Sequence, residues 1–210
     1  MLDAFVGRLA RTSSMAACAA LLAGGTMACA TKSVTRIDPG TVTDLSGRWN
    51  DTDSRLVANK LIEESLTSPW AKRYAELHGG DAPTIIVGDF DNRTMEHIPV
   101  GTFVRDLERA FIGSGAVRVV ASATERQDVR TERQDQQQYA RAESRARIGQ
   151  EQGARYMLQG ELQAIADGSG REKVMFYQVD ATLIDLETNA KVWVGDHKIK
   201  KYIERRPIGW

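Results

Sequence analysis

The fold is decided by the stretch Pro83-Thr84-Ile85-Ile86-Val87-Gly88-Asp89-Phe90. Its continuous run of apolar β-formers is typical of a central β-strand that is covered on both faces. The polar residues Asp91 to Thr94 follow directly and end the run. We therefore predict that a sheet is built around residues 83–90, with the rest of the chain supplying neighbouring strands and covering helices.

An amphipathic helix is predicted before this strand. It opens at residues 50–53, and Gly79 and Gly80 end it. Because proline disfavours helix at the residue before it, a break is expected at Ser68-Pro69. The apolar residues recur mostly at spacings of three to five and comprise Leu56, Val57, Leu61, Ile62, Leu66, Trp70, Tyr74 and Leu77.

Two more helices and a short strand are predicted after residue 94. Apolar residues at helical spacing indicate a helix over residues 103–111, which Gly113 stops. A short strand is expected over residues 117–120. A third helix is predicted over Tyr139–Gln152, where the residues expected to face the core are Ala142, Ala146 and Ile148.

Three strands are then predicted without helices between them, over residues 156–165, 173–186 and 191–199. In the middle one, apolar and polar residues alternate from 178 to 183, as in a half-buried antiparallel strand. The predicted order is therefore α-β-α-β-α-β-β-β. This order indicates an α/β (α+β) domain with a mixed four- to five-stranded sheet and helices packed on it.

The N-terminus has the features of an export signal. Arg8 and Arg11 precede a run of small apolar residues from Met15 to Ala28, which is too short to span a bilayer. We expect residues 1–28 to be a signal peptide that is removed. Their loss deletes two arginines and one aspartate from 28 basic and 28 acidic residues, which leaves 26 and 27. This balance argues against nucleic-acid binding.

A small residue directly before a cysteine, Ala28-Cys29, is what a bacterial lipoprotein signal requires, because the thiol is acylated before cleavage. We predict that Cys29 carries the lipid. Thr26 stands where such signals usually have leucine, so cleavage without acylation and the use of Cys18 stay open as alternatives. Acylation of Cys29 would leave the mature chain without a free thiol and exclude disulfides.

The mature chain is expected to contain one domain. Residues 29–50 include Pro39-Gly40 and many Ser, Thr and Asp residues without a sustained period, which indicates a flexible tether. The globular domain is predicted over residues 51–203 and a C-terminal tail over residues 204–210. A chain of 210 residues that is 42% hydrophobic is long enough for one core.

No residue pattern points to catalysis, so we expect the protein not to be an enzyme and to need no cofactor or small-molecule substrate. His78, His97 and His197 stand on different predicted elements, and none has a partner at metal-ligand spacing. A metal site is therefore not predicted. The sequence also lacks a Gly-x-Ser-x-Gly elbow and a Ser-x-x-Lys motif.

Two segments have both a functional and a structural interpretation. Residues 89–94 end the first strand, where α/β sheets often place ligand contacts, but Asp and Asn there also form loops by bonding their own backbone. Phe176, Tyr202 and Trp210 lie among cations, which suits a protein interface or an edge strand protected by charge. We favour the structural interpretation of both segments.

The segment from Glu125 to Gln138 is polar throughout. On a helical projection Arg126, Arg130 and Arg133 fall on one face, and Arg141 continues it. The opposite face carries Glu125, Asp128, Glu132 and Asp135. Such a helix either projects into solvent or is not stably formed. The arginine face is our candidate partner-binding site, since it suits a charged partner surface; a mobile charged insertion is the alternative.

Five short segments, in order, carry a family resemblance: Asn50–Leu56, Val87–Thr94, Gly113–Gly115, Gly153–Tyr156 and Leu183–Thr188. With the lipoprotein signal, the tether and the order of elements, they make the chain resemble the outer-membrane lipoprotein activators of penicillin-binding proteins, LpoB type, over roughly residues 45–203. The tether is shorter and poorer in proline than the linker of the well-known members.

The resemblance implies a fold like the N-terminal domain of TolB. It also implies a function: binding the periplasmic docking domain of a class A penicillin-binding protein and stimulating peptidoglycan synthesis. Ala30 rather than Asp next to Cys29 favours the periplasmic face of the outer membrane. The alternative is an accessory lipoprotein of an envelope export or assembly complex, as in the related curli secretion lipoproteins, which need long amphipathic strands to line a barrel.

Overall fold

The computed structural model describes residues 33–205. The predictions for the signal segment, for Cys29 and for Trp210 lie outside the described residues. The chain divides into two compact units between Thr41 and Val42, and the second unit holds all the described helices and strands. Within residues 33–205, no helix combines the length and the apolar character needed to cross a bilayer.

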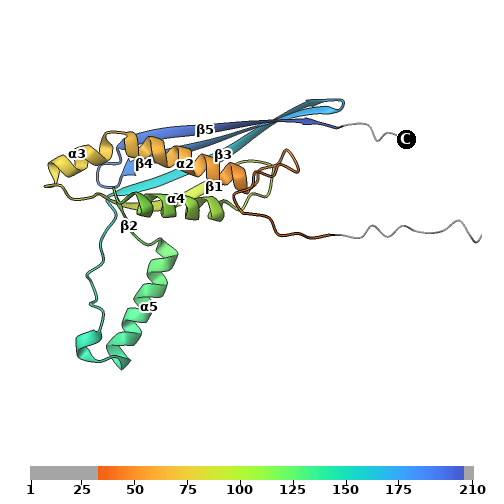
Figure 1. Cartoon of the computed structure of the whole chain (residues 1–210). Coiled ribbons are helices and arrows are strands. Elements are labelled where there is room, and N and C mark those ends of the chain that lie inside the picture. Colours follow the sequence, from red (N-terminus) through yellow and green to blue (C-terminus); the bar gives the residue numbers. More distant parts are fainter. Residues whose placement is uncertain (1–32, 206–210) are drawn as a thin grey trace, which may run out of the picture. The chain divides into compact units, whose positions relative to one another are not determined.

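Five strands form one mixed sheet in the order β2-β1-β3-β4-β5 (Figure 1). β1 runs parallel to both β2 and β3, whereas β3, β4 and β5 form an antiparallel meander. The predicted mixed sheet is thereby confirmed. The strands are β1 (Thr84–Asn92), β2 (Arg118–Val119), β3 (Tyr156–Ser169), β4 (Glu172–Asp185) and β5 (Lys191–Glu204).

Three helices pack on one face of this sheet: α2 (Asp51–Thr67), α3 (Trp70–Leu77) and α4 (Val100–Ser114) (Figure 1). The break predicted at Ser68-Pro69 is confirmed, because α2 ends at Thr67 and α3 begins at Trp70.

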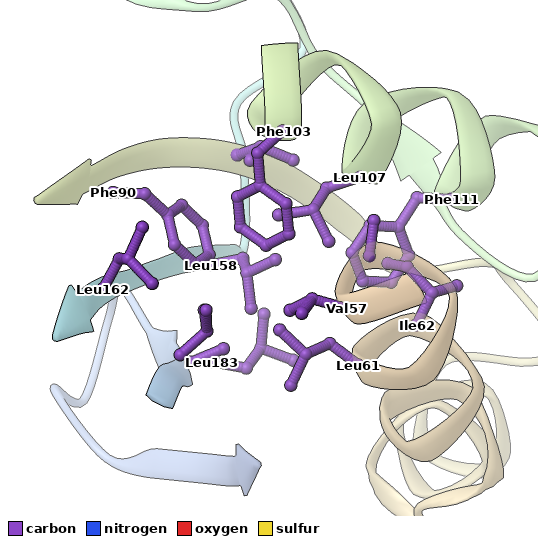
Figure 2. Close-up of a cluster of buried hydrophobic side chains, with 14 of the residues drawn as sticks. Val57, Leu61, Ile62, Phe90, Phe103, Leu107, Phe111, Leu158, Leu162 and Leu183 are labelled. Atoms are coloured by element: carbon purple, nitrogen blue, oxygen red, sulfur yellow. The ribbon is translucent and has the colours of Figure 1, made fainter. Parts of the chain in front are cut away.

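The core lies between these helices and the sheet. Figure 2 shows how side chains of α2, α4, β3 and β4 converge there, including Val57, Leu61, Leu107, Phe111, Leu158 and Leu183. Two residues assigned to the apolar face of the first helix are an exception, since Leu56 is 52% exposed and Leu77 is 81% exposed. Both fit the helical spacing but point away from the sheet.

The prediction that residues 83–90 are covered on both faces is right for only part of the strand. Residues 84–87 are buried in succession, but Asp89 and Asp91 are exposed. A bulge separates Val87 from Phe90, so that Phe90 still faces the core. Beyond the bulge the strand alternates, because no described helix covers its outer side.

A polar network joins the segment before α2 to the sheet. Tyr177 of β4 is fully buried, and its hydroxyl donates a hydrogen bond to the carbonyl oxygen of Gly47 over 3.1 Å. The ammonium of Lys201 on β5 lies 2.9 Å from Asp44 Oδ1. Residues 44–50, at the end of the predicted tether, therefore contact the domain.

The third helix was predicted at the wrong place. The structure has α5 at Ala123–Tyr139, over the charged segment. A capping box begins it, because the amide of Glu125 donates to Ser122 Oγ and the amide of Ser122 donates to Glu125 Oε2. The charged segment is thus a helix rather than an unstructured insertion, although none of its residues is buried.

The segment predicted as that helix is irregular in the structure. After Tyr139, which ends α5, it contains only the single 3₁₀ turn η1 (Ala142–Ser144), and Ile148 is 62% exposed. The extended backbone of Ala140 ends α5 before this segment begins. Three widely spaced apolar residues bury too little surface to hold a helix against the core.

Candidate partner-docking surfaces

The predicted arginine face lies on α5, but all three of its helical members have partners within the chain. Arg130 donates to both carboxylate oxygens of Glu151, over 3.0 and 2.8 Å, and Arg133 donates to the same carboxylate over 2.7 Å. The hydrogen bonds from Arg130 hold the pKa of Glu151 below its usual value. Arg126 donates to the carbonyl oxygen of Ala121.

Arg141 does not continue this face. α5 ends at Tyr139 and Ala140 is its C-cap, so Arg141 has left the helix and caps the short 3₁₀ turn instead. Its carbonyl oxygen accepts from the amide of Ser144 over 3.1 Å. The sequence projection assumed that the helix continued to residue 141. The helical arginine face therefore contains three residues, not four.

The first turn of α5 is fixed to α4. Arg105 on α4 lies 2.7 Å from Glu125 Oε1. The hydrogen bond from Arg105 and those from Ser122 lower the pKa of Glu125 from 4.5 to about 2. An ion pair with α4 and another with the segment that returns to β3 thus position a helix that buries no side chain.

A second charged surface lies on the uncovered face of the sheet. The strand register places Asp91 of β1 beside Glu161 of β3, Glu161 beside Asp180 of β4, and Asp180 beside Asp196 of β5. Directly paired residues share a face, and their chain neighbours that point to the core are Phe90, Leu162, Val179 and Ala181. We call these four carboxylates the acidic row.

The acidic row borders a groove of about 430 Å³. The groove is lined by Asp89, Asp91, Gln159, Gly160, Glu161, Asp180 and Thr182. Gly160 permits the strands to approach here, since a Cβ at this position would lie 2.2 Å from the backbone oxygen of Asp180. Apart from Gly160 the lining residues are polar or charged, unlike the mainly hydrophobic lining of a typical small-molecule pocket.

Cations lie at the two ends of the acidic row. Arg93 is 2.7 Å from Asp91 and 3.8 Å from Glu161. At the other end, the Lys198 ammonium is 2.8 Å from the carboxylate of Asp196. Asp180, in the centre, accepts from the side-chain amide of Gln178 over 2.8 and 3.1 Å. The row therefore keeps net negative charge in the middle of the sheet.

Both segments with two interpretations, residues 89–94 and the aromatic residues of the last strands, contribute to the uncovered face of the sheet. Asn92 accepts from the amide of Thr94 over 3.0 Å and donates to the carbonyl oxygen of Glu96, which supports the loop interpretation. Asp89 and Asp91 nevertheless line the groove. The sequence could not indicate the row, because its members are far apart in the chain and only the register brings them together.

The aromatic and cationic residues predicted near the last strands divide between the two faces. Phe176 pairs with Ile165 and with Lys200 beside the acidic row, and the hydroxyl of Tyr202 donates to Glu172 over 2.7 Å. Lys201 lies on the opposite face with its ammonium largely buried.

The three histidines lie on different parts of the domain. Nδ1 of His78 lies 2.8 Å from the carbonyl oxygen of Tyr74, and the two rings stack. His97 is exposed and His197 is half-buried on β5. Within residues 33–205, no group of three or more His, Cys, Asp and Glu side chains could hold a metal ion.

Comparison with known proteins gives the family. The model of the peptidoglycan-synthase activator LpoB matches residues 53–199. The LpoB C-terminal domain from Salmonella enterica is 16% identical, with 71% of this chain and 99% of that chain covered and a TM-score of 0.39.

The LpoB C-terminal domain from Escherichia coli is 13% identical at the same coverage, with a TM-score of 0.40. The PelC dodecamer from Paraburkholderia phytofirmans is 19% identical, with 58% of this chain and 74% of that chain covered and a TM-score of 0.30. No curated protein matches the chain. Because the family model spans well over half of the sequence, the chain belongs to the LpoB family of peptidoglycan-synthase activators.

Proposed function

We propose that this protein is a lipid-anchored periplasmic regulator that binds a class A penicillin-binding protein and activates peptidoglycan synthesis. The observation that carries the proposal is the family match over residues 53–199, which extends from α2 into β5. An activator acts by binding, and the charged surfaces of this domain are suited to an exposed, reversible interface.

The proposed anchor is the lipid on Cys29, at the periplasmic face of the outer membrane. Because residues 44–50 contact the domain, the free part of the tether would extend from Cys29 to Thr43. Such a segment spans about 50 Å when fully extended. The partner synthase must therefore present its docking domain within that distance of the lipid anchor.

The activator role is tested by measuring lipid II polymerisation by the cognate class A synthase with and without the purified protein. We expect a higher rate and a complex that can be isolated. A reaction that contains the protein without the synthase should show no turnover. An absence of stimulation with every class A synthase of the host would overturn the proposal.

The arginine face of α5 is the proposed docking surface. The triple charge reversal R126E/R130E/R133E should weaken binding to the synthase without lowering the thermal stability of the domain, because α5 buries no residue. Since two of these arginines bind Glu151, E151Q is the matched control that breaks the same ion pairs but keeps the arginines. If D180N in the acidic row weakens binding instead, the docking surface is the uncovered face of the sheet.

A further inference from the structure

The segment of residues 42–48, here called the strap, lies between the tether and α2. Its backbone carbonyls accept hydrogen bonds from the domain: Gly47 from the Tyr177 hydroxyl over 3.1 Å, and Arg48 from the Lys201 ammonium over 3.1 Å. Asp44 adds an ion pair with Lys201 at 2.9 Å. Lys201 in turn holds the pKa of Asp44 below its usual value.

Polar contacts dominate this attachment. The two large apolar side chains of the strap face solvent, since Val42 is 65% exposed and Leu45 is 92% exposed. Gly47 packs closely against an apolar side chain, because a Cβ at this position would lie 1.9 Å from Cδ1 of Ile203. The strap therefore buries little apolar surface, and hydrophobic burial contributes little to holding it closed.

Asn50 Nδ2 also donates to Asp44 Oδ1 over 2.6 Å, but the two side chains that hold the strap from the sheet, those of Tyr177 and Lys201, each have a second partner inside the domain. The Tyr177 hydroxyl also lies 2.8 Å from Glu96 Oε1, and the Lys201 ammonium also lies 2.6 Å from Asp53 Oδ2. After departure of the strap, the Tyr177 hydroxyl would still donate its hydrogen bond to Glu96, and the Lys201 ammonium would still pair with Asp53. Breaking a buried polar contact costs most free energy when it leaves a buried donor or charge without a partner. Release of the strap leaves neither the Tyr177 hydroxyl nor the Lys201 ammonium in that state.

Release of the strap would stop at Trp49. Trp49 follows the strap, and its indole Nε1 donates to Ser54 Oγ over 2.8 Å while its backbone amide donates to Glu96 over 3.2 Å. Its ring packs edge-on against Tyr177 with centroids 5.6 Å apart. These contacts lie within the domain and do not depend on residues 42–48.

We propose that the strap is a releasable closure that sets the free length of the lipid tether. In the closed form the tether would end at Thr43, and in the released form it would continue to Arg48. Full extension would then increase from about 50 Å to about 70 Å. This consequence for reach rests on the proposed function, whereas the release itself is a property of the protein alone.

The test is relaxation-dispersion NMR on the full-length protein at low and high salt, because the strap is held through its carbonyl oxygens and side chains rather than through its amides. In the wild type we expect residues 42–48 to populate a minor released state that leaves α2 and β4 unchanged, and to populate it more in 1 M NaCl, because salt screens the half-exposed Asp44 carboxylate. D44N and G47A should increase the released population at least tenfold and leave global unfolding unchanged. L45A is the matched control and should change neither.

Two results would overturn the proposal. If D44N and G47A lower the midpoint of global unfolding in parallel with release of the strap, the strap is an inseparable part of the fold. If neither variant changes the released population, these contacts do not hold it. Neither result bears on stimulation of the synthase, so failure of this inference is distinguishable from failure of the activator role.

Discussion

Helices α2 and α5 share their length and their N-terminal signal but not their environment. Each has 17 residues and a capping box, formed by Asn50 and Asp53 in α2 and by Ser122 and Glu125 in α5. α2 buries eight residues against the sheet and α4, whereas α5 buries none. A capping box thus specifies where a helix begins, and tertiary packing decides how strongly the rest of the protein depends on it.

The largest expected difference between the two helices concerns their apolar residues. Leu61 of α2 is 1% exposed, and L61A should lower the free energy of unfolding by about 2–5 kcal/mol, because it leaves a cavity in the core. Val129 of α5 is 43% exposed, and V129A should change the free energy of unfolding by less than about 0.5 kcal/mol. Urea denaturation of both variants measures the contrast, and similar losses would contradict it.

Removal of the two capping residues should have different consequences, global for α2 and local for α5. N50A should lower global stability by about 1 kcal/mol, since α2 unfolds only with the core. S122A removes the equivalent cap from α5 and should reduce protection of its amides without moving the global midpoint. Denaturation and amide exchange on the same samples separate the two outcomes. A shift of the global midpoint in S122A would show that α5 is coupled to the core.

The pH dependence of α5 follows from Glu125. Its pKa is lowered in the folded protein from 4.5 to about 2, so the carboxylate stabilises α5 fully above pH 4.5. This stabilisation is lost as pH falls from 4.5 towards 2, because protonation breaks the contact with Arg105. NMR signals of α5 should follow this change in the wild type and not in E125Q. Identical profiles would exclude Glu125 as the cause.

The smallest expected effect concerns the far end of α5. E151Q removes the charge that both Arg130 and Arg133 contact, and exposed ion pairs contribute little to stability. Global unfolding should not change, while amides in the last two turns of α5 should exchange faster. Unchanged exchange would mean that the capping box and the Arg105 contact alone hold the helix.

The chain order of strands and core helices could be predicted because each core element carries its own signal. The run at residues 84–87, the alternation along β4 and the proline break between α2 and α3 act within a few residues. The third helix was predicted too far along the chain because the apolar residues after Tyr139 resemble a helical face, whereas the start of α5 is marked by the polar capping box of Ser122 and Glu125. The projection that included Arg141 extended a helix beyond its real end.

Contacts between distant segments could not be predicted. The pairing of Arg130 with Glu151 joins residues 21 positions apart, and the contact of Lys201 with Asp44 joins residues 157 positions apart. The acidic row depends on the register of four strands, which alternation within one strand cannot supply. Each of these contacts can therefore be identified only from the folded structure.

The sequence by itself determined the mixed sheet, the break between α2 and α3, and the resemblance that led to the family, because local periodicity, proline geometry and short motifs act along the chain. Only the tertiary structure decided which face of the sheet stays uncovered, which arginines are already paired and where the tether meets the domain. Those properties depend on which distant side chains share one environment, and burial and charge pairing are set by that environment.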